Sequence, residues 1–425
     1  MSIPLDQLYH YIEHVAKEIT DNIVIYRFYP YGSKNIEDLE ELVGPISWED
    51  QTLKIPLYCN DQEPLNYSLY QNAIVTTKDF DNLLRSLSLN KNRNLDIKPS
   101  IYDNALLLHS EQRSKNLIKY QNNQFIPVYY WSHAVISLDW YRYAQHITQR
   151  KSIRKKFLIY NRAWSGTREY RLKFTDLLIN LNLVNDCHSS INAIEPDLGI
   201  HYTQHTFSNS KWKPSCVLEN YFPNNTAHSH SSAEFDIHDY ESTDIEMVLE
   251  TLFDDDRLHL TEKSLRPIAL GQPFIIAGTY GSLEYLRNYG FKTFDHLWDE
   301  SYDLEKNPSK RLHKIVEVMK QISQWDLKTK TEKMRQAQSI ADYNKKHFFS
   351  DAFFCQIKSE LNHNLQTAII QIDKINNINS FIEYWEGLLS IEEITTFLEN
   401  DKPGQHPGIP TTKQVNNVLK IAKQR

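Results

Sequence analysis

The chain has 425 residues, 40% hydrophobic and 24% charged, and carries a net charge of −7. This length allows one to three domains, and the acidic balance argues against a protein devoted to non-specific nucleic-acid binding. Four widely spaced cysteines indicate neither a disulfide framework nor a zinc ribbon. The N-terminus is typical of an amphipathic helix and not of a signal peptide. No apolar stretch approaches the ~18 residues of a membrane span, so we expect a cytoplasmic protein. A composition rich in Asn, Ile and Lys hints at a viral source, with the host cytoplasm as the compartment.

After the N-terminal helix, the first 150 residues alternate between strand-like and helical patterns. The expected strands are 22–30, 72–77 and 101–108, and the expected helices are 35–43, 78–88 and 136–147. A basic segment, Gln149–Lys156, then interrupts the pattern. A composition break of this kind favours an inter-domain linker, although a charged loop inside one domain would look the same.

The alternation then restarts. The expected strands are 156–161, 216–220, 245–251 and 273–278, and the expected helices are 167–182, 260–271 and 281–290. Strands and helices that alternate in this way predict parallel sheets. Beyond about residue 304 the pattern changes to long helices, at 309–346, 350–372 and 379–399. We therefore expect an α/β protein with domains at 1–150 and 151–305 and a helical extension and tail at 306–425.

The expected helix after Leu260 begins with an unusual charge pattern. Thr261 is a good N-cap, and Glu262 suits the positive end of the helix dipole. Lys263 and Arg266 do not, because cations are disfavoured near a helix N-terminus. An anion bound to the first free amides would explain them, and a phosphate or diphosphate is the natural occupant. The Glu262 carboxylate would then suit a ribose diol. The alternative is an ordinary capped helix whose cations point to solvent.

A second crowded helix start follows the strand that ends at Asn161. Three arginines, Arg162, Arg168 and Arg171, surround a short Ser/Gly turn there. Guanidinium groups bind phosphate through two parallel hydrogen bonds and stay charged. Two such helix starts in one domain indicate a nucleotide diphosphate. The alternative is a solvated basic turn.

Two carboxylates in the first domain are candidates for a catalytic base. Asp61 and Glu63 precede Pro64, which holds Glu63 in an extended conformation. Sugar transfer with inversion needs a carboxylate that removes a proton from the acceptor hydroxyl, with a pKa raised by partial burial. The alternative is a polar turn. In the second domain Glu250 ends a buried strand, where it would be either a ligand contact or an exposed strand end. Three consecutive acids, Asp254–Asp256, are more typical of caps than of a metal site.

The stretch LHLTEKSLRPIALGQPFIIAG (258–278) resembles the donor-binding signature of the fucosyltransferase-like glycosyltransferases with the GT-B fold. Glu250 corresponds to their strand Glu, and Glu262 and Lys263 to their Glu-Lys pair. The resemblance implies that the Glu holds the donor ribose and the Lys the phosphates, while Arg162, Arg168 or Arg171 contacts the diphosphate. Asn60–Pro64 resembles the family's Gly-Glu-Asn-Glu-Ser-Pro region, where Glu63 takes the place of the proposed base. Residues 278–303 are similar to a stretch of uncharacterised viral and bacterial relatives.

The family implies two Rossmann-like domains facing a cleft. It also implies an inverting, metal-independent enzyme that moves a sugar from a nucleotide-diphospho-sugar to a glycan or other hydroxyl acceptor without a cofactor. The sugar, whether hexose, fucose or pentose, stays open. One alternative is a viral enzyme that glycosylates hydroxylated bases in DNA. The basic segments 150–156 and 90–93 would then line the surface that binds the duplex. Another is a catalytically inert scaffold or binding protein of the same fold. The chain has no GxGxxG, P-loop or GxSxG motif, which argues against dinucleotide oxidoreductases, P-loop kinases and α/β-hydrolases.

Overall fold

We describe the fold from a computed structural model. The residues that it describes are 2–4, 7–20, 23–27, 55–62, 64–65, 105–122, 125–220 and 233–386. The elements expected at 35–43, 72–77 and 78–88 lie outside these residues. So do Glu63 and the basic run at 90–93.

The first sheet has four parallel strands in the order β1-β2-β3-β4. Their bounds are Ile23–Arg27 (β1), Ile55–Cys59 (β2), Ala105–His109 (β3) and Phe125–Tyr129 (β4). Helix α1 (Leu8–Lys17) contacts β1, and α4 (Lys115–Asn122) contacts β4. Because all four strands run the same way, the polar residues that follow β2, β3 and β4 lie along one edge of the sheet.

The second sheet is also parallel, with the order β6-β5-β7-β8. The strands are Lys155–Asn161 (β5), Cys187–Ile191 (β6), Thr243–Leu249 (β7) and Phe274–Ala277 (β8). Every residue of β7 is buried, as is typical of a central parallel strand. After β5 the chain forms β6 on one side of it, and it then crosses to the other side of β5 to form β7. The carboxyl ends of these two strands therefore form a topological switch point, where ligands bind in open α/β sheets.

Helices surround the second sheet. Their bounds are Tyr170–Asn180 (α6), Ile237–Glu241 (α7), Glu262–Leu270 (α8), Ser282–Asn288 (α9), Pro308–Ser323 (α10) and Leu327–Phe348 (α11). Thr261 caps α8 through its hydroxyl, and Gly271 ends this helix with a left-handed backbone at φ 70°. Both ends of α8 therefore lie within two residues of the positions that its sequence predicts.

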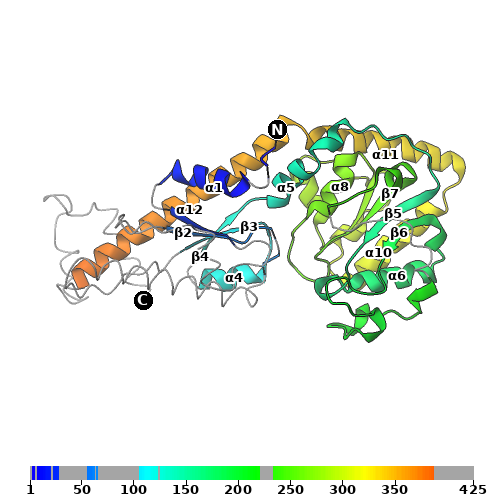
Figure 1. Ribbon diagram of the computed structural model, residues 1–425, viewed down its shortest axis with the longest axis horizontal. Coiled ribbons are helices and arrows are strands. Elements are labelled where there is room, and N and C mark those ends of the chain that lie inside the picture. The colour runs from blue at the N-terminus through cyan, green and yellow to red at the C-terminus, as the bar shows by residue number, and fades with distance from the viewer. Residues whose placement is uncertain are drawn as a thin grey trace.

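Two helices join the sheets (Figure 1). Helix α5 (Ser132–Trp140) and the 3-10 turn Arg142–His146 lead from the first sheet to the second. Helix α12 (Asp351–Glu386) returns from the second sheet and runs along the first, where it contacts α1, α5, β3 and β4. The first sheet is thus built from the beginning of the chain and covered by a helix from near its end.

The mixed α/β class with parallel strands is confirmed, whereas some elements differ from expectation. The strand predicted at 216–220 is wrong, because Leu218–Asn220 forms a 3-10 turn. Side chains take the backbone amides there: Cys216 N donates to Asp176 Oδ1 at 2.9 Å, and Leu218 N to Tyr202 Oη at 3.1 Å. The helix predicted at 309–346 is two helices, since Asp326 caps a new one by accepting from Thr329 N. The helix predicted at 136–147 ends at Trp140 and continues as the 3-10 turn.

Candidate functional site

Asp61 lies just beyond the carboxyl end of β2. Its side chain is buried, and its Oδ1 accepts a hydrogen bond from Tyr9 Oη at 2.8 Å. Its Oδ2 accepts one from Tyr130 Oη. Burial raises the pKa of Asp61, although the hydrogen bonds from Tyr130 and Tyr9 oppose the rise. Both oxygens are therefore occupied, and the role of Asp61 as a base stays a prediction, as does that of Glu63.

The carboxyl end of β3 presents a second buried carboxylate, Glu111. Its Oε1 accepts from Leu65 N at 2.6 Å and lies 3.9 Å from Arg257 Nη1 of the second half of the chain. Its Oε2 has no hydrogen-bond partner among the residues that the structure describes. Burial raises the pKa of Glu111 to about 7. A carboxyl with such a pKa can accept or release a proton near neutral pH.

The residues after β4 connect the first sheet to α8. His133, in the first turn of α5, places Nε2 2.9 Å from Gln62 O and Nδ1 3.2 Å from Glu262 Oε2. His133 therefore contacts both Gln62 of the first half of the chain and Glu262 of the second. Lys263 Nζ lies 2.6 Å from the other oxygen, Glu262 Oε1. Burial would raise the pKa of Glu262, but Lys263 and His133 outweigh it and hold this pKa well below its usual range.

A second histidine lies beside this group. His259 is buried, and its ring meets that of His133 edge-on with centroids 5.0 Å apart. Its Nδ1 lies 3.2 Å from Ser110 O, while Nε2 has no partner in the described part of the chain. Burial, together with the neighbouring His133, lowers the pKa of His259 to about 3. His259 is therefore a neutral ring with an open nitrogen lone pair. We call Asp61, Glu111, His133, His259, Glu262 and Lys263 the polar junction.

The start of α8 already holds an anion, the carboxylate of Glu250. Its Oε1 accepts from the backbone amides of Thr261 (3.1 Å) and Ser264 (3.2 Å) and from the Ser264 hydroxyl, and its Oε2 accepts from the Thr261 hydroxyl. Glu250 is fully buried, so it is not an exposed strand end. The expectation of free amides at this helix start is therefore wrong for these two groups, because the protein supplies the anion itself.

The cations of α8 likewise have protein partners. Arg266 is buried and pairs with Glu246 at 2.6 Å, so it does not point to solvent or toward the helix start. Lys263 keeps a partly exposed side chain, at 17%, beside Glu262. Of these two cations, Lys263 is the one that remains available to a ligand.

The three arginines near β5 divide into two kinds. Arg162 Nη2 donates to Asp197 Oδ1 at 3.2 Å, and Arg168 Nη2 lies 3.8 Å from the other oxygen of this carboxylate. Arg171 is buried instead and donates to three backbone carbonyls, those of Ala163, Leu249 and Glu250. Its Nε has no partner among the described residues. Arg162 and Arg168 can thus reach a ligand, whereas Arg171 ties the carboxyl ends of β5 and β7 together.

Glu250 connects the two helix starts. Its backbone carbonyl accepts from Arg171 Nη2 at 3.1 Å and from Tyr170 Oη at 2.7 Å, at the start of α6. Its side chain binds the start of α8, as described above. The two groups of donor-binding candidates therefore meet at one strand end, the switch point between β5 and β7.

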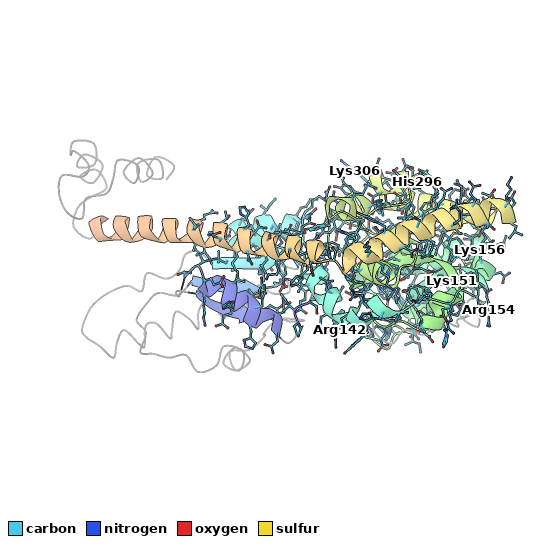
Figure 2. All side chains as sticks on the ribbon, turned by 90° about the horizontal axis from the view of Figure 1, so that it is seen from above. Arg142, Lys151, Arg154, Lys156, His296 and Lys306 are labelled. Carbon is cyan, nitrogen blue, oxygen red and sulfur yellow. The ribbon has the colours of Figure 1, made fainter. Side chains whose placement is uncertain are left out.

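Two lysines of the basic segment at 150–156 donate to neighbouring backbone carbonyls. Lys151 Nζ donates to Tyr240 O and Thr243 O, and burial lowers its pKa to about 8. Lys156 Nζ donates to Ser323 O at 2.7 Å. Figure 2 labels Lys151, Arg154 and Lys156 on the second half of the molecule. Two of these three side chains thus hold backbone carbonyls, and the placement of DNA on this segment stays a prediction.

Sequence reasoning did not identify Glu111, His133 or His259 as site residues. Glu111 carried a usable signal, since it follows the apolar run of β3 by one residue and parallel strands place such residues at one edge. The contact between His133 and Glu262 joins residues 129 positions apart. No local pattern indicates such a contact.

Comparisons with models of protein families, with curated proteins and with solved structures gave no match. The chemistry of the polar junction must therefore be argued from its own residues. Within the described ranges, no helix has both the length and the apolar character to cross a bilayer.

Proposed function

We propose that the protein is a glycosyltransferase that takes a sugar from a nucleotide-diphospho-sugar. The observation that carries the proposal is the polar junction, where groups from the carboxyl edges of two parallel sheets lie together. Parallel sheets bind ligands at this edge, and titratable groups with shifted pKa values gather at functional sites. Here one carboxyl has a pKa near 7, another is held ionised, and a neutral histidine lies beside them.

The donor would lie against the second sheet. Lys263 would contact the diphosphate and Glu262 the ribose, as the resemblance to the fucosyltransferase-like family implies. Arg162 or Arg168 would provide a second cation, because both are partly exposed and share one carboxylate. Glu250 and Arg171 would act as positioning residues. Glu250 binds the backbone amides at the start of α8, and Arg171 binds backbone carbonyls at the ends of β5 and β7. Cations in place of a metal would stabilise the leaving diphosphate.

The reaction would join the acceptor oxygen to the anomeric carbon of the sugar. As this bond forms, the bond from the anomeric carbon to the diphosphate oxygen breaks, and the nucleoside diphosphate leaves with the electron pair. A carboxylate of the first sheet, Asp61 or Glu63, takes the proton of the acceptor hydroxyl. In this proposal the two sheets are the cores of the two GT-B domains, and their closure over the substrates excludes water.

A panel of GDP- and UDP-sugars tests the proposal by thermal shift and by release of nucleoside diphosphate. A bound donor must raise the melting temperature, because it binds only the folded state. We expect Lys263→Ala to weaken donor binding about tenfold or more, the effect of losing one charged hydrogen bond. Lys310→Ala is the matched control, because Lys310 is an exposed lysine in the first turn of a capped helix, α10.

Failure has two distinct forms. If no sugar nucleotide binds or turns over, the protein is not this enzyme, and a binding or scaffold role takes its place. If a donor binds and Lys263→Ala binds it equally well, the donor site has been put in the wrong place. Transfer to hydroxylated DNA that falls steeply with salt would instead favour the DNA-modifying alternative.

A further inference from the structure

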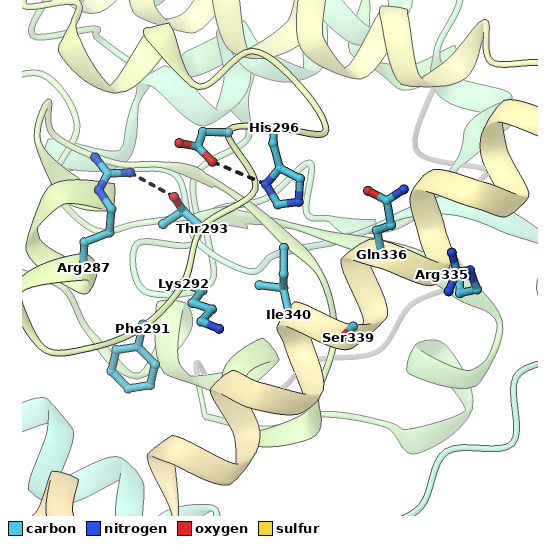
Figure 3. A pocket seen from close by; sticks show the side chains of 10 residues that line it. Arg287, Phe291, Lys292, Thr293, His296, Arg335, Gln336, Ser339 and Ile340 are labelled. Carbon is cyan, nitrogen blue, oxygen red and sulfur yellow. Dashed lines mark hydrogen bonds and ion pairs between the residues drawn. The ribbon is translucent and has the colours of Figure 1, made fainter.

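A cavity of about 610 Å³ lies on the second half of the molecule, and it shares no residue with the polar junction. It opens between the segment 287–296 and the middle of α11 (Figure 3). The lining residues are Arg287, Phe291, Lys292, Thr293, Asp295, His296, Arg335, Gln336, Ser339 and Ile340. This volume falls within the roughly 300–1,000 Å³ of pockets that hold small ligands.

The lining is basic, although the chain as a whole is acidic. Arg287, Lys292 and Arg335 are positive, and Asp295 is the single acid in the lining. The chain as a whole carries a net charge of −7, so the positive charge of this lining is opposite in sign to the net charge of the protein. A hollow lined mainly by one sign of charge concentrates ligands of the opposite sign.

Two of the three cations lack a carboxylate partner within the described ranges. Arg287 does have partners, Thr293 Oγ1 at 2.9 Å and Glu300 Oε2 at 3.6 Å. Lys292 places its ammonium 4.0 Å from the centroid of the Tyr343 ring, and Arg335 is exposed on α11. Figure 3 shows Arg287 at one edge of the view and Arg335 at the other, with Lys292, His296 and Ile340 between them.

Part of the cavity lining is apolar. Phe291 and Ile340 are buried apolar side chains, and the buried Thr293 lies beside them. Such a lining suits a ligand with one anionic group and one apolar part, because burying apolar surface and pairing the charge both favour binding.

We propose that this cavity binds a small phosphate-bearing organic molecule, with the phosphate held by the basic lining to which Lys292 and Arg335 contribute, and the apolar part on Phe291 and Ile340. The site is independent of the proposed sugar-nucleotide site. A phosphate suits this lining, since a guanidinium can pair with it through two hydrogen bonds and its charge of about −2 is matched by more than one cation.

Phenyl phosphate tests the proposal by titration calorimetry, with phenol as the uncharged comparison. Wild-type protein should bind phenyl phosphate and not phenol. The double variant Lys292→Ala/Arg335→Ala should lose at least about tenfold in affinity, since two charged contacts disappear. Both side chains are exposed, so the folded state should survive, and an unchanged melting temperature without ligand checks this. Lys346→Ala, an exposed lysine of α11 outside the cavity, should bind as wild type does.

Lys263→Ala separates this site from the proposed donor site. The proposal requires that Lys263→Ala leave phenyl phosphate binding unchanged. It is overturned if wild-type protein does not bind phenyl phosphate, or if the double variant binds it as well as wild type does. A loss of binding in Lys263→Ala would also overturn it, because the phosphate would then lie at the polar junction.

Discussion

At the scale of single residues, the Glu250 carboxylate occupies the position at the start of α8 that a bound phosphate occupies at other helix N-termini. It accepts from two backbone amides and two hydroxyls at the first turn of α8. The positive end of this helix is therefore already neutralised. A second anion at the same place would have to be held by side chains, chiefly Lys263, and its binding would weaken with salt.

Glu111 gives the stability of the protein a specific pH dependence. Its folded-state pKa is raised from 4.5 to about 7, so the folded protein holds this proton more tightly than the unfolded chain does. The resulting stability is fully present below pH 4.5 and is lost as the pH rises through about 7. Glu111→Gln removes the titration but keeps an acceptor for Leu65 N. From pH 5 to pH 8, its free energy of unfolding should gain about 2–3 kcal/mol relative to wild type.

Urea unfolding of both proteins at the two pH values measures this difference. Glu300, whose pKa burial also raises to about 7, is present in both proteins and cancels. Glu317→Gln, at a half-exposed position of α10, is the control and should follow the wild-type pH dependence. If Glu111→Gln and wild type change in parallel, Glu111 does not hold a proton near neutral pH.

Sequence reasoning identified residue types at the candidate site but not their partners. Lys263, Arg266 and Arg171 were correctly recognised as cations at helix starts, because dipole and capping rules act over a few residues. Their partners are Glu262, Glu246 and three backbone carbonyls. Apart from Glu262, these partners come from other elements, so only the tertiary structure reveals that Arg266 and Arg171 are internal.

At the scale of elements, adjacent isoleucines on α12 offer a matched pair. Ile369 is fully buried and belongs to the hydrophobic core, whereas Ile370 is 43% exposed. Ile369→Ala should cost about 2–5 kcal/mol, because it removes a buried side chain and leaves a cavity. Ile370→Ala should cost less than about 1 kcal/mol. Chemical denaturation measures both, and equal losses would contradict the packing of α12 on the first sheet.

The elements that could be predicted are those with a strong local pattern. The apolar runs of β5, β7 and β8 and the capped helix α8 were found within one or two residues. β6 was missed because its sequence, CHSSI, is largely polar and alternates between buried and half-buried positions. β2 and β4 each contain a proline, which weakens a strand signal. Pairing with neighbouring strands, which no local pattern records, makes these segments strands.

At the scale of the whole molecule, Trp131 joins the two halves. It follows β4, it is fully buried, and its indole Nε1 donates to Leu260 O at 3.0 Å. Its ring packs against Tyr285 and Tyr289 of the second half, with centroids 4.8 and 4.7 Å away, and against Phe353 of α12. The halves should therefore unfold together.

Calorimetry of wild type and Trp131→Ala tests this coupling. We expect one transition for wild type and two for Trp131→Ala, because the variant loses about 3–5 kcal/mol of packing at the contact. Trp131→Phe keeps the ring and should retain a single transition at a lower temperature. Two separate transitions in the wild type would mean that the contact does not couple the halves.

The return of α12 to the first sheet also determines when that sheet can be completed during synthesis. A ribosome releases the chain from its N-terminus, so β1 to β4 emerge long before the helix that covers them. Until residues 351–372 have been translated, the apolar surface that α12 covers is exposed to solvent or to a chaperone. The second half, whose strands and adjoining helices form one uninterrupted stretch of the chain, faces no such delay.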